Sequence, residues 1–287
     1  MTWKAERVTR NTVKIKVDMK KRKDWQQWCL LRSDAHHDNP RCDQAMEKRH
    51  LEQAVERDAM IIDNGDLFCA MQGKWDKRSD KNAIRPEHQG GNYLDLLVDT
   101  TREFYRPYGK QFAVLGRGNH ETAIRKCHET DLIDRLEVGM RQDGSPVLAS
   151  GYGGWVKFSF MLGKCHVDSV ILYHYHGSGG GGPVTKGTIQ TNRITAYTPD
   201  AQVVLTGHTH DDWIFPLTRQ RLSDHLRVYR DEQLHIRAPG YKDAWDDGAA
   251  GFEVERMHGP KPTGAVWLQF AWNSRTNRIQ VEAVRAK

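Results

Sequence analysis

The sequence has none of the features of a membrane-spanning, secreted or fibrous protein. No apolar run approaches the ~20 residues that a membrane helix needs. The first twenty residues carry charges throughout, so no signal peptide can be recognised. Neither an internal repeat nor a low-complexity linker interrupts the chain. We therefore expect a globular chain with no membrane partner.

Cysteine is scarce, and its spacing excludes two kinds of small stabilised fold. The chain has five cysteines, which is an odd number, and no two of them form a C-x-x-C pair. This count argues against a disulfide framework and against a cysteine-type structural zinc site. A reducing compartment is the natural setting for such a chain, so we expect a cytoplasmic location.

What the sequence does contain fits one large α/β domain. Its 287 residues include nine Trp, nine Tyr and eight Phe, which supply bulky side chains for a core. We expect a single domain over 1–287. Within it, 1–24 is an N-terminal extension and 216–287 is a β-rich C-terminal part that completes the second sheet.

The charge balance is mildly basic. Lysine and arginine exceed the acidic residues by six, and the isoelectric point is near 9.0. A basic surface favours polyanionic partners, although six charges on a chain of this length are few. The balance therefore points toward phosphate-rich ligands, with nucleic acid as one candidate.

Hydrophobic spacing predicts most of the secondary structure. Apolar residues spaced three and four apart predict helices over 43–57 and 93–105. Short apolar runs predict strands over 12–17, 28–32, 59–62, 112–115, 156–161, 169–173 and 203–205. Alternation predicts a hairpin around a turn at 273–277. Pro183 is well placed to open a further helix.

Metal-ligand residue types recur where the predicted strands end. The set consists of Asp34 and His36, Asp66, Asn119 and His120, His174 or His176, and His208 and His210. In open α/β sheets, ligands bind outside the carboxyl ends of the strands, where loops on a rigid scaffold bring side chains together. One motif of this kind is weak evidence, but five in succession predict a metal site.

The residue types suit divalent cations. Carboxylate, imidazole and amide oxygen together fit manganese, iron, zinc or magnesium. A D-x-H or H-x-H spacing places two ligands on the same side of an extended chain. The carboxylate of Asp66 can bridge two ions, which would share a hydroxide and hold a phosphoryl group for in-line attack.

This ordered set resembles the calcineurin-like metallophosphoesterase superfamily, whose pattern is D-x-H, G-D, G-N-H-[DE], H and G-H-x-H. The matching pieces are Asp34-Ala35-His36, Gly65-Asp66, Gly118-Asn119-His120-Glu121, His176-Gly177 and Gly207-His208-Thr209-His210. The resemblance covers about 30–215. It implies a four-layer α/β/β/α sandwich with two mixed β-sheets and a dinuclear metal site at the C-terminal ends of the strands.

The resemblance also implies a role for each matching residue. One metal ion would be held by Asp34, His36, Asp66 and His210. The second would be held by Asp66, Asn119, His176 and His208. His120 resembles the family's catalytic histidine, which stabilises the transition state or protonates the leaving oxygen; an imidazole can do this near neutral pH.

The sequence departs from the family pattern at one position and is ambiguous at others. Relatives often have G-D-x-x-D, whereas Cys69 stands here at the last position. His174 and His176 both face one way if the strand continues, and we prefer His176 because it lies nearer the strand end. His37 and Asp38 could touch substrate, but an exposed loop pair is the simpler interpretation.

The implied activity is hydrolysis of phosphoric ester bonds by a metallophosphoesterase. Two divalent ions would be the cofactors; manganese is preferred, and iron, zinc, nickel or magnesium would also fit. We favour a phosphodiesterase or nuclease-type activity. A phosphomonoesterase or protein phosphatase is one alternative, and a catalytically silent metal-binding scaffold is another.

Three further segments are candidates for contact with a phosphate-ester substrate. The first is the charged stretch 72–89. The second is the glycine run Gly179–Gly182, whose backbone N–H groups could meet a phosphate oxygen. The third is 237–263, where aromatic and basic residues could form a rim. Its members are Tyr241, Lys242, Trp245, His258 and Lys261.

Overall fold

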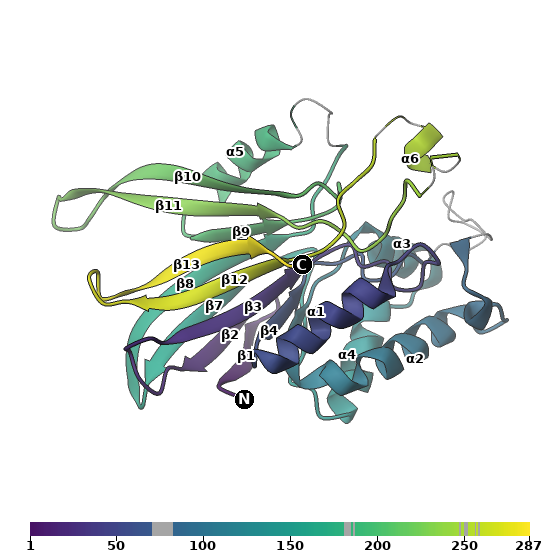
Figure 1. The fold of residues 1–287 in the computed structure, drawn as a ribbon, viewed down its shortest axis with the longest axis horizontal. Coiled ribbons are helices and arrows are strands. Elements are labelled where there is room, and N and C mark those ends of the chain that lie inside the picture. The colour runs from purple at the N-terminus through teal and green to yellow at the C-terminus, as the bar shows by residue number, and fades with distance from the viewer. Residues whose placement is uncertain are drawn as a thin grey trace.

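The computed structural model describes residues 1–70, 83–180, 185, 187–246, 248–249, 252–255, 257 and 259–287. Within this part of the chain, a seven-stranded and a six-stranded mixed sheet pack face to face, with helices on the outside (Figure 1). The layers therefore follow the order α/β/β/α that the sequence predicted. No helix among the described residues is both long and apolar enough to cross a membrane.

The six-stranded sheet carries the parallel strands whose ends matter most for function. Its order is β13-β12-β3-β4-β5-β6. Strands β3 to β6 run parallel to one another, and β12 runs antiparallel to both of its neighbours, β3 and β13. Their bounds are β3 (Gln26–Arg32), β4 (Met60–Asp63), β5 (Phe112–Leu115), β6 (Leu148–Ala149), β12 (Val266–Asn273) and β13 (Arg278–Arg285).

Three helices cover the outer face of this sheet, and further short helices connect its strands. The covering helices are α1 (Gln44–Glu56), α2 (Tyr93–Tyr105) and α4 (Leu132–Gln142). Helix α3 (Asn119–His128) follows β5 directly. Short helices lie at η2 (Pro86–His88), η3 (Arg106–Gln111) and α6 (Phe252–Glu255).

The seven-stranded sheet has the order β1-β2-β7-β8-β9-β11-β10. Its outer face is covered by helix α5 (Thr188–Tyr197). The strands are β1 (Trp3–Thr9), β2 (Thr12–Asp18), β7 (Gly153–Leu162), β8 (Cys165–Tyr175), β9 (Val203–Thr206), β10 (Trp213–Leu222) and β11 (Val228–Arg237). Strands β8 and β9 are parallel, so their carboxyl ends lie at one edge.

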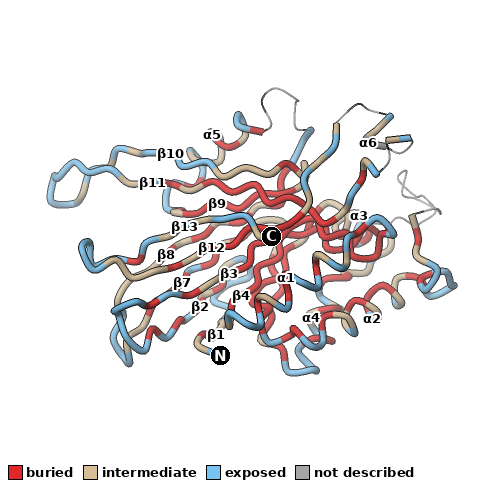
Figure 2. Tube along the Cα trace, in the orientation of Figure 1, coloured by how far each residue is buried: buried red, intermediate tan, exposed pale blue. Residues whose placement is uncertain are grey.

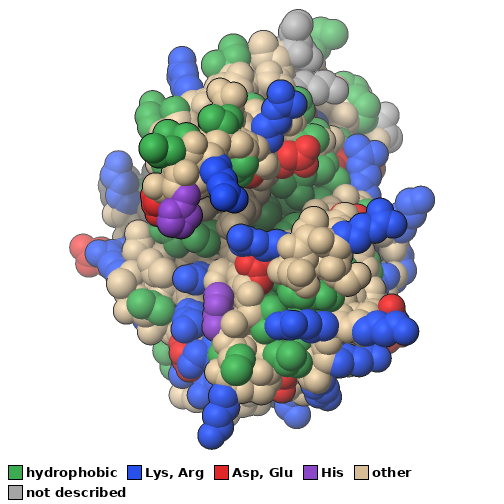
Figure 3. Space-filling view, turned by 90° about the vertical axis from the view of Figure 1, so that its left-hand side faces the viewer, with side chains coloured by type: hydrophobic (Ala, Val, Ile, Leu, Met, Phe, Trp, Pro, Cys, Tyr) green, Lys and Arg blue, Asp and Glu red, His purple; other side chains and the backbone are tan. Residues whose placement is uncertain are grey.

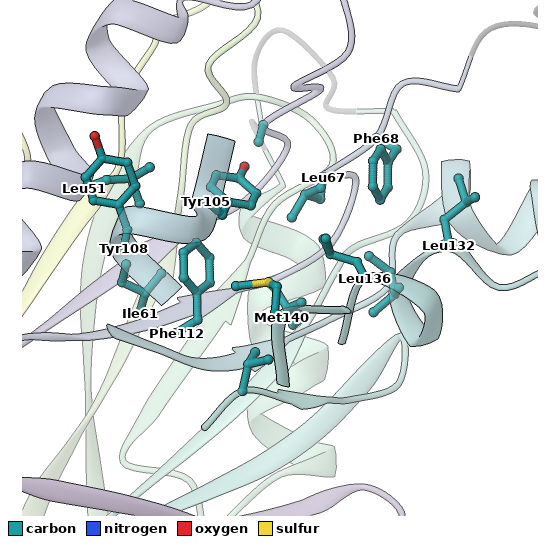
Figure 4. Close-up of a cluster of buried hydrophobic side chains, with 14 of the residues drawn as sticks. Leu51, Ile61, Leu67, Phe68, Tyr105, Tyr108, Phe112, Leu132, Leu136 and Met140 are labelled. Carbon is teal, nitrogen blue, oxygen red and sulfur yellow. The ribbon is translucent and has the colours of Figure 1, made fainter. Parts of the chain in front are cut away.

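Two hydrophobic cores hold the layers together (Figure 2). One fills the space between the sheets and includes Ile15, Phe158 and Phe270. The other lies between the six-stranded sheet and its helices, where Tyr105, Phe112 and Leu136 pack with other apolar side chains (Figure 4). Burying each large apolar side chain contributes about 1.5–3 kcal/mol.

Burial on both faces explains why the central strands are short apolar runs. Every residue of β4, β5 and β9 is buried. A parallel strand covered on both sides has no solvent face, so its sequence does not alternate. The outer strand β10 has one exposed face and does alternate.

The chain ends differ from the predicted organisation. The expected N-terminal extension contributes β1 and β2, which join the seven-stranded sheet through β7. The C-terminal part supplies strands to both sheets rather than to one: β10 and β11 join the seven-stranded sheet, and β12 and β13 the other. The helix expected from Pro183 begins at Thr188, and Pro183 lies outside the described residues.

Candidate metal centre

The predicted ligand residues lie at the carboxyl ends of strands from both sheets. Asp34 and His36 follow β3, Asp66 follows β4, Asn119 follows β5, His176 follows β8, and His208 and His210 follow β9. Because β3, β4 and β5 are parallel, and β8 and β9 are parallel, each sheet gathers its loops at one edge. The two edges meet at the site.

A first group of possible ligands joins both sheets. The Nε2 atom of His36 lies 3.3 Å from Nε2 of His210, and the latter lies 3.3 Å from Oδ1 of Asp34. One ligand atom from each residue falls within 4.8 Å of the others. These three residues belong to the set implied for the first metal ion.

A second group lies beside the first. The Nε2 atom of His176 is 3.1 Å from Oδ2 of Asp66 and 3.2 Å from Oδ1 of Asn119. The same Asn119 oxygen is 2.8 Å from Nδ1 of His208. His176 Nε2 also lies 3.9 Å from Oδ1 of Asp34, so this imidazole faces a carboxylate of each group.

The donor atoms fit divalent cations. Asp34 is fully buried, and its Oδ1 accepts no hydrogen bond from the described residues. Its other oxygen accepts hydrogen bonds from the Ser33 hydroxyl and the His208 backbone N–H. Two imidazole nitrogens and a carboxylate oxygen that face one another match the ligand types of manganese, iron or zinc.

The backbone of the site is held in a sparsely populated conformation. Five of the seven predicted ligands have left-handed φ angles between +46° and +72°, namely Asp34, His36, Asp66, His208 and His210. Each such residue costs on the order of 1–3 kcal/mol and persists only where the surroundings fix it. Their concentration in three short loops indicates a site built for function rather than for stability.

Two glycines let these loops approach closely. A side chain at Gly118 would place its Cβ 2.0 Å from Oδ1 of Asp66, and one at Gly207 would place it 2.4 Å from Oδ2 of Asp34. Both contacts are far inside van der Waals distance. The glycines of the G-N-H-E and G-H-x-H motifs are therefore required by packing against the carboxylates.

The carboxylates of Asp66 and Asp34 stabilise positive charge at the metal centre. Burial disfavours a charged His176, but Asp66 and Asp34 outweigh it and raise the pKa of His176 to about 10. Burial likewise opposes ionisation of Asp66, and His176 and His120 nonetheless keep the pKa of Asp66 well below its ordinary value. A divalent cation would satisfy the same electrostatic demand.

The surroundings of His36 favour its neutral form instead. Burial, followed by the nearby His120 and Lys242, lowers the pKa of His36 well below its ordinary value. Its imidazole is therefore neutral near pH 7. A neutral imidazole has a free nitrogen lone pair, which is the form that coordinates a metal.

His120 borders the two groups and is held in one orientation. Its Nδ1 lies 2.6 Å from the Cys69 carbonyl oxygen, so Nδ1 carries a proton and donates it there. Its Nε2 lies 3.7 Å from Oδ2 of Asp66. The backbone N–H of His120 also donates to Oδ1 of Asp66 at 2.9 Å. The Nε2 side of the ring therefore faces the site.

The structure distinguishes the two candidate histidines, His174 in β8 and His176 directly after it. His176 faces Asp66 and Asn119, whereas His174 contacts Ser150 Oγ at 2.9 Å and the Asn64 side chain at 3.2 Å. His174 is fully buried, and burial lowers its pKa to about 4. His174 thus contacts Ser150 and Asn64 rather than the ligand atoms.

The loop pair His37 and Asp38 is not exposed, contrary to the sequence interpretation. Both are buried. His37 Nδ1 lies 2.7 Å from a carboxylate oxygen of Glu47, and Asp38 accepts hydrogen bonds from the backbone N–H groups of Cys69 and Ala70. Asp38 thus attaches the D-x-H loop to the loop after Asp66, and His37 attaches it to α1, so neither side chain is available to a substrate.

The proposed rim 237–263 is likewise only partly correct. Tyr241 is fully buried and its hydroxyl lies 2.9 Å from Nδ1 of His50, while Lys261 donates to Asp211. Lys242 does reach the site, since its Nζ lies 3.9 Å from Sγ of Cys69. His258, the glycines at 181–182 and most of the charged stretch 72–89 lie outside the described residues.

Sequence reasoning gave no role to two residues that position ligands. Glu121 is buried and accepts hydrogen bonds from the backbone N–H groups of Asp66, Phe68 and Gly118. The Asn64 carbonyl oxygen accepts from Nδ1 of His176 at 3.0 Å, which leaves Nε2 facing the ligands. Glu121 could have been noticed as the fourth residue of the G-N-H-E motif, whereas no sequence pattern pointed to Asn64.

Comparison with known proteins gives fold-level likenesses only. No protein-family profile and no curated protein matches the sequence. Vacuolar protein sorting 29 from Cryptosporidium parvum is 11% identical, with a TM-score of 0.41, over 92% of this chain and 100% of the other. A predicted phosphoesterase from Streptococcus pneumoniae is 10% identical, with a TM-score of 0.34, over 91% and 98%. Zinc-bound Vps29 from Entamoeba histolytica is 9% identical, with a TM-score of 0.37, over 90% and 99%.

At such identities and TM-scores, these likenesses carry no information about activity. What identifies the site is internal to this chain: five motifs in a fixed order, each at a strand end, on two facing sheets. In motif order and in architecture, the chain resembles the calcineurin-like metallophosphoesterase superfamily.

Proposed function

We propose that this protein is a dinuclear metal-dependent hydrolase of phosphodiesters. The observation that carries the proposal is the pair of adjoining ligand groups, Asp34 with His36 and His210, and Asp66 with His176 and His208. They adjoin at His176, which lies within 3.9 Å of a carboxylate oxygen from each group. Paired sites of this kind are used to hydrolyse phosphate esters.

The proposed ligands divide into two sets that share one carboxylate. Asp34, His36 and His210 would hold one ion, and His176, His208 and Asn119 the other, with Asp66 between them. When bound, two divalent cations would supply Lewis acidity toward the phosphoryl oxygens and acidify water. Manganese is our preferred ion, although the ligand set also suits iron, zinc, nickel or magnesium.

His120 is the proposed source of the proton for the leaving oxygen. Its Nδ1–H is committed to the Cys69 carbonyl, so only Nε2 can exchange a proton with a bound ester. In the protonated imidazole, Nε2 carries an N–H that can be donated as the ester bond breaks.

Lys242 is the proposed contact for a non-bridging phosphate oxygen. It stands beside Cys69, the position where relatives often have a carboxylate. A lysine adds one positive charge without consuming a ligand position. This favours an anionic ester.

The surface charge is compatible with nucleic acid as the diester. Figure 3 shows the end of the molecule that carries the turns of the long hairpins, where Lys and Arg side chains predominate over Asp and Glu. That end is remote from the ligand loops, since β10 and β11 meet the G-H-T-H loop at their other ends. It would attract a polyanion without defining the cleaved bond.

Initial rates on small chromogenic esters test this proposal. The protein is stripped with chelator, reloaded with manganese and assayed with bis-p-nitrophenyl phosphate and p-nitrophenyl phosphate. Diester cleavage well above monoester cleavage supports the phosphodiesterase, and DNA and RNA follow as substrates. Monoester preference would make it a phosphatase, and no turnover despite two bound ions would make it a silent scaffold.

A further inference from the structure

A cavity lies beside the metal centre, between β8 and helix α5. Its volume is about 380 Å³, within the range of small-molecule sites of about 300–1,000 Å³. Its floor is formed by the outer face of β8, because Tyr173 and Tyr175 alternate with the inward-facing His174 and His176. Helix α5 supplies the opposite wall.

Tyrosine rings line this cavity on both its strand side and its helix side. Tyr173 and Tyr175 are half-buried on the strand side, and Tyr197 on the helix side is 77% exposed. An exposed tyrosine over a cavity is a platform on which a planar group can stack. Base–aromatic stacking of this kind is tolerant of base identity.

The charged side chains of the cavity are cationic, and its other polar side chains are neutral. Arg193 projects from α5 and is exposed, and Arg237 from β11 is 97% buried, with a relative exposure of 3%. Neither makes an ion pair with the described residues, and no acidic residue lines the cavity. Among the described residues, Arg237 donates through Nη1 to Gly207 O at 3.0 Å and to Thr209 Oγ1 at 2.8 Å.

The carboxylates of Asp211 and Asp34 act on Arg237 from beyond ion-pair distance, and a buried guanidinium is costly when its N–H groups are not all paired. The Nε atom of Arg237 has no hydrogen-bond partner within the described part of the chain. Two arginines and three tyrosines together match a planar ring that carries a negative group. We propose that this cavity binds a nucleotide unit, with its base against Tyr197 and its phosphate toward Arg193 and Arg237.

The cavity adjoins the metal centre through two loops. Gly177, in its wall, directly follows His176, and Thr206 directly precedes the G-H-T-H loop. Arg237 contacts Thr209, which stands between His208 and His210. This inference rests on the proposed phosphodiesterase in one respect: the bound unit would be the nucleotide next to the cleaved bond.

Equilibrium binding to metal-stripped protein tests the cavity independently of catalysis. Adenosine 5′-monophosphate is titrated by calorimetry at fixed salt, because phosphate contacts are salt-dependent. Arg193→Ala is expected to weaken binding about tenfold, and Tyr197→Ala about fivefold, the lower end of stacking losses. Tyr197→Phe keeps the ring and is expected to bind within about twofold of the original chain.

The matched control is Arg49→Ala, which removes the same charge from an exposed position on α1. It is expected to leave nucleotide binding unchanged. A trinucleotide that binds more tightly than the mononucleotide would identify a strand as the source of the unit, and equal affinity would identify a free nucleotide.

Absence of nucleotide binding, or equal affinity in Arg193→Ala, Tyr197→Ala and Arg49→Ala, would overturn the cavity proposal. Hydrolysis of bis-p-nitrophenyl phosphate is measured on the same preparation after reloading with manganese. Normal hydrolysis without nucleotide binding would reject the cavity alone. Nucleotide binding without hydrolysis would support the cavity and reject the phosphodiesterase.

Discussion

The Glu121 carboxylate holds Asp66 in place by binding the backbone N–H of Asp66 rather than the Asp66 side chain. The Glu121 carboxylate accepts the Asp66 backbone N–H at 3.1 Å, and it accepts two more N–H groups from Phe68 and Gly118. The loop after β4 is therefore fastened to the first turn of α3. Asp66 and His120, which lie on these two elements, are therefore held next to each other by one buried carboxylate.

We expect Glu121→Gln to lower manganese affinity about 10–100-fold, as loss of a group that orients a ligand does. The amide would place N–H donors against backbone donors, which leaves at least one buried group unsatisfied. Calorimetric titration with manganese measures the effect. Thr122→Ser, in the same turn, is the control; unchanged affinity in Glu121→Gln would show that the loop is fixed by other contacts.

We expect His120→Ala to reduce kcat by more than ~100-fold on diesters with poor leaving groups. The reduction should be much smaller for bis-p-nitrophenyl phosphate, because p-nitrophenolate leaves without a proton. Rates across esters with leaving groups of increasing pKa measure this dependence. A loss that is equal for good and poor leaving groups would contradict the acid role and leave only transition-state stabilisation.

We expect Asp66→Asn to reduce turnover by more than ~100-fold, measured as the initial rate of diester hydrolysis.

We expect His176→Ala to lose one of two bound ions. His174→Ala should keep both ions, since His174 touches Asn64 and Ser150 rather than the ligand atoms. Metal content by mass spectrometry after dialysis gives the stoichiometry. If His174→Ala lost the ion and His176→Ala kept it, the assignment of the two histidines would be reversed.

We expect Lys242→Ala to raise KM for the diester about tenfold with a smaller change in kcat, because it removes one charge-assisted contact to the ester. Lys242→Arg should restore part of the affinity. Steady-state kinetics at low and high salt measure both parameters. Unchanged KM at low salt would place the Lys242 ammonium outside the substrate site.

We expect acid to remove the stability that Glu47 provides. Glu47 is buried and bonded to Arg32, His37 and Tyr105. Burial raises its pKa, but His37 and Arg32 outweigh burial and lower the pKa to about 2, from an ordinary value of 4.5. The folded state thus binds fewer protons than the unfolded state between these values, so the contribution is full above pH 4.5 and declines as the pH falls toward 2.

Urea unfolding of the original chain and Glu47→Gln at pH 7, 4 and 3 measures this dependence. At pH 7 the variant should be less stable by about 3–5 kcal/mol, because it leaves Arg32 short of a buried partner. The difference should shrink by roughly 1–3 kcal/mol at the lowest pH. A difference that is constant with pH would mean that Glu47 acts through packing alone.

Much of the secondary structure was readable because the central strands and two helices have strong local patterns. Helix α2 spans the predicted residues, and β5 does also. Helix α3 was not predicted, since it begins inside the G-N-H-E motif and buries only Glu121 and Ile124. The assignment of β1, β2 and β10 to β13 to particular sheets depends on long-range pairing, which no local pattern encodes.

The sequence by itself determined which residues are candidate ligands and in what order they occur, because each motif is a few residues long and follows a strand. It favoured His176 over His174 only by its place nearer the strand end; the contacts distinguish them, since His176 faces Asp66 and His174 faces Asn64. Burial of His37 and Asp38, the hydrogen bonds of Glu121, and the guanidinium of Arg237 beneath α5 were decided by tertiary structure alone. Each depends on contacts between segments far apart in the chain, and such contacts exist only once the sheets and helices have packed together.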